Sequence, residues 1–410
     1  MQKKEHLDQM LSDPQMRDRL ESHLKSKKRI LGEDSPFSEL LQGMVNVMLT
    51  GEMSDFLDEE KASGRKNKRN GGMTKRVTSE LGPLEIYTPR DRNGHFTPEI
   101  VRKRERQLSS GLDEQILALY AQGNSIEDVR RLLIEIYGVS ISAGKISQIT
   151  DQVLPEIEEW RSRGLNSFYP IVYLDAIHFK VREDGKYKNS AFYTVYSVDW
   201  EGNRDLLGLY INSGGEGAMR WGIVLEDLKR RGVKDVLVIC TDNLNGFSKA
   251  IQDSFPYTIV QKCIVHQVRN SLKYIDDSDR KEVVKDLRKI YTSVTEEQAK
   301  SALASFEVKW GSKYKYIVQQ WTDNWDELMA FLDFPVGMRK MIYTTNPVEA
   351  LHRIMRKLLK SKAAWVSETA IIKQIYLSLK YNEKSWKRKA YGWKQIQRTI
   401  MELYPERIPK

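Results

Sequence analysis

Residues 168–260 alternate strand and helix patterns in an order that few folds allow. Three β-rich segments come first, at 168–180, 191–198 and 205–211. The break between the second and third, Asp199–Asn203, is typical of a hairpin loop, and the three strands are predicted to form an antiparallel meander. A helix over 219–231 then leads to the apolar run Val236-Leu-Val-Ile-Cys240, typical of a buried strand, and to a further strand at 258–260. The order β-β-β-α-β-α-β predicts an α/β core built on a mixed sheet.

The composition limits what surrounds this core. Of the 410 residues 40% are apolar, which is enough for several domains, yet no apolar run approaches the roughly 18 residues that span a bilayer. The first residues lack the apolar stretch of a signal peptide, so we expect no membrane association. Only Cys240 and Cys263 are present, which excludes a disulfide scaffold and a four-cysteine zinc site. The net charge of +10 favours a polyanion as partner.

Changes of composition and periodicity divide the rest of the chain. We expect mostly helical segments around the α/β core, with a basic stretch near residue 70. The predicted segments are an N-terminal helical region (1–60), a basic linker with a short β-hairpin (61–110), a helix-turn-helix-like domain (111–165), the first part of the α/β core (166–265), an all-α segment (266–340), a further core helix (341–365) and a basic C-terminal helical segment (366–410).

The 111–165 segment shows three helices separated by tight turns. Ser125 and Asp128 form a capping box that opens the second helix, and Ser142 opens the third. The third helix turns Ile146 and Ile149 inward. Its outward polar residues include Lys145, Ser147 and Gln148. Such groups near a helix N-terminus are typical of a reader of the DNA major groove, but a plain helical hairpin has the same pattern.

Two aspartates lie in or directly after predicted strands of the core. Asp175 lies inside the first strand, and a buried carboxylate there must be paired, neutralised or bound to metal. Asp242 directly follows the buried strand, at the sheet edge where α/β proteins build their sites. The alternatives are a structural ion pair for Asp175 and a turn-forming residue for Asp242.

Glu349 stands at a predicted helix start, where a glutamate needs no explanation beyond capping. The same helix continues with four cations that share a face with Glu349, whereas Leu351 and Leu358 lie on another. These cations are Arg353, Arg356, Lys357 and Lys360. An acid that heads a basic stripe also suits a site that cuts phosphodiesters beside its DNA track. Three acids brought together can hold two divalent ions, for which hard oxygen donors select Mg²⁺ or Mn²⁺.

Three other features could indicate a metal-binding, nucleotide-binding or base-stacking site. Cys263 and His266 are only half of a zinc site, so we expect the pair to pack beneath the sheet or His266 to contact a DNA phosphate near Asp242. The glycine-rich segment 213–220 lacks the spacing and the lysine of a nucleotide-binding loop, and no nucleotide cofactor is expected. Three tryptophans at 310, 321 and 325 are expected in a helical core, with stacking on an extruded base as the alternative.

Seven segments together resemble the Mutator-type transposases of prokaryotic insertion sequences, which belong to the DDE superfamily with a ribonuclease-H-like core. The segments are Pro89–Gly94, Leu119–Gly123, Ile146–Asp151, Leu174–Arg182, Thr241–Phe247, Gln261–Asn270 and Ile342–Glu349. Each is weakly diagnostic by itself, but their order and spacing are specific.

The resemblance implies a function and assigns the site. The catalytic, metal-binding acids fall on Asp175, Asp242 and Glu349, the Cys-x-x-His signature falls on Cys263 and His266, with an active-site role for His266, and the all-α segment becomes an insertion before the third acid. The implied activity is DNA strand cleavage and strand transfer at terminal inverted repeats, with Mg²⁺ or Mn²⁺ and no nucleotide. Double-stranded DNA, both repeats and target, would be the partner of a homodimer or higher oligomer in the prokaryotic cytoplasm, at the nucleoid.

Two other functions remain open from the sequence. The chain could be a catalytically inactive, transposase-derived DNA-binding protein in which the acids are relics, although the presence of all three acids argues against this. A structure-specific nuclease with a similar core is the second alternative, but it would not need the predicted end-binding helices.

Overall fold

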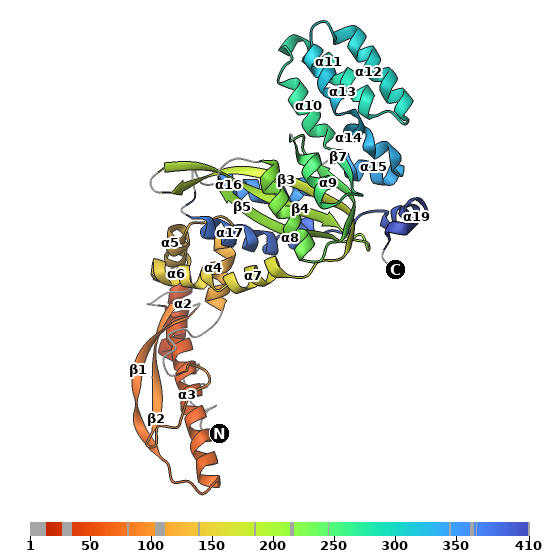
Figure 1. Ribbon diagram of the computed structural model, residues 1–410. Helices are drawn as coiled ribbons and strands as arrows, with labels where there is room; N and C mark the ends of the chain where they lie inside the picture. Colours follow the sequence, from red (N-terminus) through yellow and green to blue (C-terminus); the bar gives the residue numbers. More distant parts are fainter. Residues whose placement is uncertain are drawn as a thin grey trace. The chain divides into compact units, whose positions relative to one another are not determined.

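The computed structural model describes residues 14–26, 35–79, 82–102, 111–137, 140–183, 186–213, 217–244, 246–343, 346–360, 365 and 367–408. The chain divides into two compact units, Met1–Gln152 and Val153–Lys410. The first unit is coloured red to yellow in Figure 1 and the second yellow-green to blue. Each unit is described by itself.

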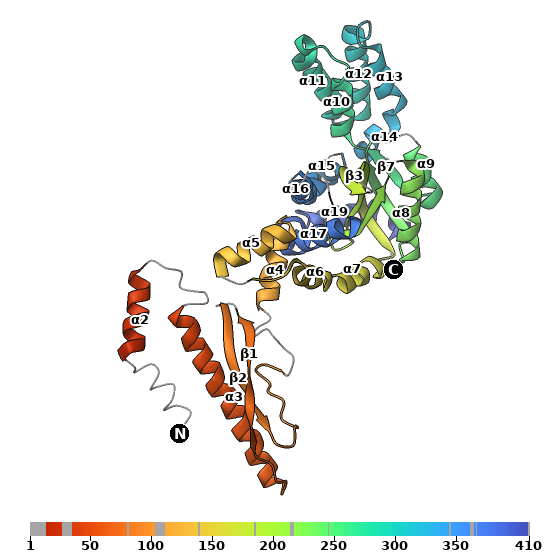
Figure 2. The ribbon, with the colours of Figure 1, turned by 90° about the vertical axis from the view of Figure 1, so that its left-hand side faces the viewer.

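The first unit starts with helices α2 (Pro14–Lys25) and α3 (Pro36–Ala62), followed by the antiparallel pair β1 (Arg69–Ser79) and β2 (Gly82–Asp91). The hydroxyl of Ser35 caps α3 by accepting a hydrogen bond from the Phe37 amide at 3.2 Å. The hairpin lies along α3 (Figure 2) because both contribute apolar side chains to one small core. Its buried members include Val45, Leu49, Val77, Leu84 and Ile86.

The hairpin is longer than the sequence predicted, because β1 begins inside the segment that we expected to be a linker. Residues 69–74 are exposed, so their strand lacks the apolar alternation that marks a half-buried strand. Gly71, at φ +66°, lies where the pairing register shifts, as in a β-bulge. Gly72 is covered by the ring of Tyr87, since an added Cβ would lie 2.4 Å from the Tyr87 Cζ atom. Cross-strand backbone pairing and this aromatic cover hold the start of the strand, which contributes no side chain to the core.

Helices α4 (Gly111–Ala121), α5 (Ile126–Tyr137) and α6 (Ala143–Asp151) contact one another and complete the first unit. The capping box is confirmed: the Asp128 amide donates to the Ser125 hydroxyl at 3.1 Å, and the Ser125 amide donates back to the Asp128 carboxylate at 3.1 Å. The Ser142 hydroxyl caps α6 by accepting from the Lys145 amide at 3.2 Å. Ile146 and Ile149 are buried, as predicted.

The second unit begins with α7 (Leu154–Ser162), which the sequence placed in the 111–165 domain. This helix packs instead on β5 and α17 of the second unit, so the predicted domain spans both units.

A five-stranded mixed sheet forms the centre of the second unit (Figure 1). Its strands are β3 (Phe168–Glu183), β4 (Lys186–Val198), β5 (Arg204–Ser213), β6 (Asp235–Thr241) and β7 (Ile259–Lys262), in the order β5-β4-β3-β6-β7. Strands β3, β4 and β5 pair antiparallel in succession, whereas β6 pairs parallel with both β3 and β7. The mixed α/β architecture predicted from the sequence is therefore confirmed.

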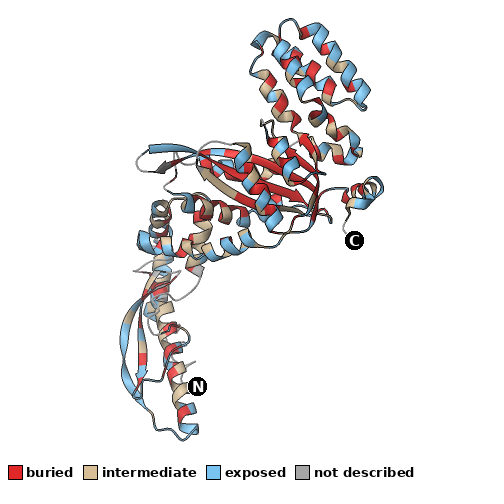
Figure 3. Ribbon diagram, in the orientation of Figure 1, coloured by how far each residue is buried: buried red, intermediate tan, exposed pale blue. Residues whose placement is uncertain are grey.

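Helices cover both faces of this sheet, and buried residues concentrate on it (Figure 3). Helices α8 (Ala218–Arg230) and α9 (Phe247–Ser254) cover one face, with Val172, Leu174 and Trp221 in the core between them. Helices α16 (Asn346–Lys360) and α17 (Glu368–Tyr381) contribute to the core of the other face, with Ile171 and Tyr173. Because side chains alternate along a strand, Asp175 faces the same side as Tyr173, toward α16.

The segment between β7 and α16 is helical. It comprises α10 (Ile264–Leu272), α11 (Asp277–Tyr291), α12 (Glu296–Trp310), α13 (Lys315–Asp323), α14 (Trp325–Met329), the 3₁₀ turn η1 (Ala330–Asp333) and α15 (Val336–Ile342). Trp310, Trp321 and Trp325 are buried here, and their indole N–H groups donate to Asp286, Ser271 and Glu296 at 3.0–3.1 Å. The core interpretation of these tryptophans is confirmed.

The chain continues through α18 (Glu383–Trp386) and α19 (Trp393–Leu403) to the 3₁₀ turn η2 (Pro405–Arg407). Within the described residues, none of the helices combines the length and apolar character that a bilayer crossing requires.

Candidate active site

The sheet places Asp175 and Asp242 on neighbouring strands. Strands β3 and β6 pair in parallel, with Leu174 opposite Thr241. Asp175 is the next residue of β3 and Asp242 is the first residue after β6, so both acids directly follow this pair of partners. Asp175 is 8% exposed, and Asp242, just past the end of β6, is half-buried.

A closed set of hydrogen bonds holds Asp175. Its Oδ1 accepts the Ala176 amide at 2.8 Å, and its Oδ2 lies 3.2 Å from Nδ1 of His352 on α16. Nε2 of the same imidazole lies 2.9 Å from the Thr194 hydroxyl, which donates to the backbone carbonyl of Asp175 at 2.8 Å. Because a hydroxyl has one proton to give, Nε2 of His352 is the donor toward Thr194. Both ring nitrogens are therefore used to fix one aspartate.

The Asp175 carboxyl is kept ionised by these contacts. Burial raises its pKa, but the hydrogen bond and electrostatic attraction of His352, with smaller contributions from the neighbouring His266 and the Ala176 amide, outweigh burial. The pKa of Asp175 consequently lies below its ordinary value. An ionised carboxylate in a buried strand is the state that a cation ligand needs.

His266 on α10 also reaches the Asp175 neighbourhood. Burial lowers the pKa of this imidazole; the Asp175 carboxylate opposes the shift, while Arg269, Arg356 and His352 add to it. His266 is therefore mostly neutral at pH 7, and its buried Nδ1 has no hydrogen-bond partner among the described residues.

The Cys-x-x-His segment is attached to the end of β6. The Cys263 amide donates to the Thr241 carbonyl at 2.8 Å, directly before Asp242. Cys263 is buried at the start of α10, and burial together with this thiol raises the pKa of the Cys240 thiol well above its ordinary value. The structure therefore shows Cys263 buried at the start of α10, with His266 one turn further along.

Helix α16 brings Glu349 to the same side as His352. The two residues are three apart, which puts them on one helix face, and Glu349 is half-buried. Leu351 and Leu358 are buried on the neighbouring face. The predicted basic stripe is exposed at all four positions, Arg353, Arg356, Lys357 and Lys360. The side chains of Asn346 and Pro347, expected to start the helix, lie outside the described residues.

The structure thus gathers some of the predicted residues more closely than others. Asp175 and His266 interact electrostatically. Asp242 is related to Asp175 through the pairing of β6 with β3, and Glu349 is related to it through its position on α16, three residues before His352. Among the described residues, no group of three or more His, Cys, Asp or Glu side chains is arranged closely enough to hold a metal ion. Residues 214–216 of the glycine-rich segment lie outside the described residues.

His352 and Thr194 are the residues that sequence reasoning missed. A signal for His352 was present, since it stands between Leu351 and Met355 on the buried side of α16. A histidine within an apolar face needs a polar partner, but the sequence does not say which one.

In the first unit, Lys145 and Gln148 are exposed on α6, and Ser147 is half-buried. Lys145 forms no ion pair among the described residues, and its side chain is exposed to solvent. The outward set predicted for a DNA-reading helix is therefore presented as expected, while its contact with DNA stays a prediction.

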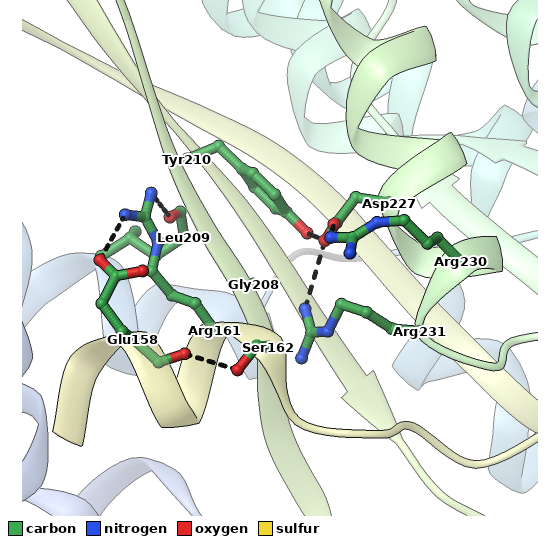
Figure 4. Close-up of a pocket in the computed structure, with 9 residues that line it drawn as sticks. All are labelled: Glu158, Arg161, Ser162, Gly208, Leu209, Tyr210, Asp227, Arg230 and Arg231. Atoms are coloured by element: carbon green, nitrogen blue, oxygen red, sulfur yellow. Dashed lines mark hydrogen bonds and ion pairs between the residues drawn. The ribbon is translucent and has the colours of Figure 1, made fainter. Parts of the chain in front are cut away.

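A pocket of about 250 Å³ elsewhere on the second unit is lined by α7, β5 and the end of α8 (Figure 4). The Arg231 guanidinium donates to the Leu207 carbonyl at 2.7 Å, where β5 shifts register, and to the Arg163 carbonyl at 3.0 Å. Asp227 neutralises Arg230 and accepts from the Tyr210 hydroxyl. Because its charges are paired and it lies at a helix C-terminus, this pocket has little preference for an anion. We therefore interpret it as a structural feature of the sheet edge and not as a binding site.

Comparison with known proteins identifies the family. Residues 14–389 match the family described as "Transposase, Mutator family". The chain is 37% identical over 407 residues to the transposase for insertion sequence element ISRM3 of Rhizobium meliloti, and to a probable transposase for an ISRM3-like element of Sinorhizobium fredii. Each alignment covers 99% of this chain and 98% of the relative.

Two further similarities were found. A probable insertion-sequence transposase of Corynebacterium diphtheriae is 37% identical over 78% of this chain and 98% of its own. The solved Drosophila P element transposase strand transfer complex is similar at 12% identity and a TM-score of 0.29, over 74% of this chain and 87% of that one. The family match and the insertion-sequence relatives show that the chain belongs to the Mutator family of transposases.

Proposed function

We propose that this DNA transposase cuts and joins DNA at Asp175, Asp242 and Glu349, in a core of the ribonuclease-H-like type, as a Mg²⁺-dependent DDE enzyme. The observation that carries the proposal is the parallel pairing of β3 and β6, in which the residues directly before the two acids, Leu174 and Thr241, are partners. Glu349 supports it from α16, one turn before the histidine that contacts Asp175.

The donor set suits a hard divalent cation. Asp175, Asp242 and Glu349 offer carboxylate oxygens, which Mg²⁺ and Mn²⁺ prefer. Asp175 keeps a lone pair on each oxygen after its contacts with Ala176 and His352, since a carboxylate accepts about four hydrogen bonds. When bound, the cation would polarise the phosphodiester and lower the pKa of an attacking water. No nucleotide cofactor is needed.

Both reactions are in-line substitutions at phosphorus. In cleavage, a water oxygen forms a bond to the phosphorus at the end of the element, and the bond to the 3′ oxygen breaks. In strand transfer, that freed 3′-hydroxyl attacks a target phosphodiester, and a target 3′ oxygen leaves. One P–O bond forms for each that breaks, so no external energy source is required.

The chain's own residues would have separate tasks. His352 and Thr194 hold the Asp175 carboxylate in one orientation. His266 lies near Asp175 as a largely neutral imidazole, suited to hydrogen bonding at the reacting phosphate. The exposed cations Arg353, Arg356, Lys357 and Lys360 would carry the DNA backbone past this site.

The terminal inverted repeats would be recognised by α6, through Lys145, Ser147 and Gln148. The exposure of Lys145 and Gln148, with Ser147 half-buried beside them near the start of a capped helix, supports this assignment. Because two element ends must be handled together, we propose that at least a dimer assembles on DNA. The alternative function is an inactive transposase-derived DNA-binding protein, in which the same acids serve only the fold.

A plasmid assay tests the proposal. Supercoiled plasmid carrying the repeats that flank the gene should be nicked with Mg²⁺ or Mn²⁺, and the same plasmid without repeats should be cut far less. Repeat binding without cleavage at any divalent cation concentration would favour the inactive alternative. Equal cleavage of both plasmids would indicate a nuclease instead of an end-specific transposase.

A further inference from the structure

A second basic surface follows α17 in the C-terminal part of the second unit, beginning on α18, which contacts α16. Residues 384–398 contain no acid, and six exposed cations. These are Lys384, Lys387, Arg388, Lys389, Lys394 and Arg398. Lys387 pairs with Glu383 at 2.7 Å, whereas the other five have no ion pair among the described residues. We name these six residues, together with Tyr391, the C-terminal basic surface.

The backbone of this surface is fixed to the turn between β4 and β5. The Trp386 carbonyl accepts a hydrogen bond from the Tyr196 hydroxyl of β4. Four residues later, the Ala390 amide donates to the Gly202 carbonyl at 2.8 Å. Trp386 and Ala390 are both buried, so the backbone that carries the exposed cations between them is anchored at both ends.

The start of α19 is fixed to the same turn. The Trp393 indole and the Gln397 side chain both donate to the Trp200 carbonyl, at 2.8 and 3.0 Å. Gly202, at φ +81°, lies directly against Trp393, since an added Cβ would come within 2.3 Å of the indole. Only glycine suits this position, which allows the tryptophan to pack onto the turn.

Tyr391 is 97% exposed at the centre of this anchored segment. Its ring contributes nothing to the core, although buried Ala390 precedes it and buried Trp393 follows closely. A hydroxyl donor stands among unpaired cations on a backbone that is already ordered, so binding a polyanion here costs little backbone conformational entropy.

We infer that the C-terminal basic surface docks the sugar–phosphate backbone of duplex DNA, independently of its sequence. The occupant follows from charge complementarity and from the chain being a DNA transposase. The part of the surface from Ala390 to Arg398 is distinct from the site, because the β4–β5 turn that anchors it lies beside the start of β3, where Val198 pairs with Ile171, whereas Asp242 follows the carboxyl end of β6. It therefore adds a DNA contact that the catalytic proposal does not use.

The test measures binding of the full-length protein to random-sequence duplex over a range of salt concentrations. Lys384→Ala/Arg388→Ala/Lys389→Ala should weaken binding and lower the slope of log affinity against log salt by about two to three units, roughly one per lost phosphate contact. Tyr391→Phe should weaken binding without changing the slope, because a neutral hydroxyl releases no counterion.

A matched control removes three other exposed cations of the same unit. Lys281, Lys285 and Arg288 on α11 are exposed and form no ion pair among the described residues. Lys281→Ala/Lys285→Ala/Arg288→Ala lowers the net charge equally, so the inference expects a smaller change of slope than in the first triple variant. Equal slopes in the two triple variants, or a wild-type slope in the first, would overturn the inference. Unchanged melting temperatures show that the variants are folded.

Discussion

Nδ1 of His352 lies 3.2 Å from Oδ2 of Asp175, which ties helix α16 to strand β3 at the carboxylate assigned to the reaction. Glu349 lies one turn earlier on α16. The contact therefore fixes two of the three proposed acids with respect to each other, one directly and one through the rotation of its helix.

Replacing His352 should affect catalysis through Asp175. His352→Leu keeps the buried volume but removes both hydrogen bonds, and we expect cleavage to fall by about 10- to 100-fold, as when an outer partner of a metal ligand is lost. The Mg²⁺ concentration for half-maximal cleavage should rise. His352→Asn, which can still donate to the carboxylate, should recover part of the loss. If the Leu variant folds and cleaves with wild-type rate and metal dependence, His352 does not position Asp175.

Glu349→Gln separates a capping role from a catalytic one. Glutamine can still complete a capping box, so the free energy of unfolding should change by only about 0.5 kcal/mol, the usual effect of a charge near a helix N-terminus. Cleavage should nevertheless fall by orders of magnitude, because a neutral amide does not replace an anionic ligand. Glu297→Gln in the first turn of α12 is the matched control and should cut normally. A Glu349→Gln protein that melts early but cuts normally would support capping alone.

Substitutions of the outward residues of α6 should separate the contribution to DNA affinity from the contribution to sequence specificity. Gln148→Ala should reduce the preference for repeat DNA over random DNA, by about 1–3 kcal/mol if its amide reads a base edge. Lys145→Ala should weaken both complexes similarly and lower the salt slope by about one unit if it contacts a phosphate. Competition binding measures both effects. An unchanged preference in the Gln148 variant would exclude it as a base reader.

Whether a feature of the fold or the site could be predicted from the sequence depends on how far apart in the chain its interacting residues lie. The capping box of Ser125 and Asp128 could be predicted because its hydrogen bonds join residues three apart. The strand order was predictable because Val236–Cys240 is apolar throughout and is flanked by turns. The sequence also placed Asp175 inside the first strand and Asp242 directly after the buried strand, but it did not show that these two strands pair.

The remaining features depend on distant partners. The start of β1 was missed because Gly72 is stabilised by Tyr87 across the hairpin and not by an apolar pattern. His352 was missed because its partners, Asp175 and Thr194, come from strands far earlier in the chain. The anchoring of Trp393 on the β4–β5 turn is equally remote, since it pairs the C-terminal region with Trp200.

Asp286 should contribute to the acid sensitivity of the helical segment. Burial raises its pKa, but hydrogen bonds from Lys289, Lys309 and the Trp310 indole outweigh burial and hold the pKa well below its ordinary value. A carboxyl with a depressed folded-state pKa stabilises the fold above its unfolded pKa of about 3.9 and loses that contribution as the pH falls.

Asp286→Asn should therefore destabilise the protein by about 2 kcal/mol at pH 7, the order expected for hydrogen bonds to a buried charged group. The difference from wild type should shrink as the pH falls below about 4, where the wild-type carboxyl starts to lose its advantage. Denaturant unfolding between pH 3 and pH 7 would measure this. A difference that stays constant over this range would contradict the assigned role.

The central claim is that Asp175 and Asp242 act as one site, and single-turnover cleavage of repeat DNA by Asp175→Asn and Asp242→Asn tests it most directly. Both variants should bind repeat DNA with nearly wild-type affinity and show cleavage reduced by several orders of magnitude, with Mg²⁺ or with Mn²⁺. The double variant should be no worse than either single one, because residues of one catalytic unit are not additive. Wild-type cleavage by either single variant would contradict the claim.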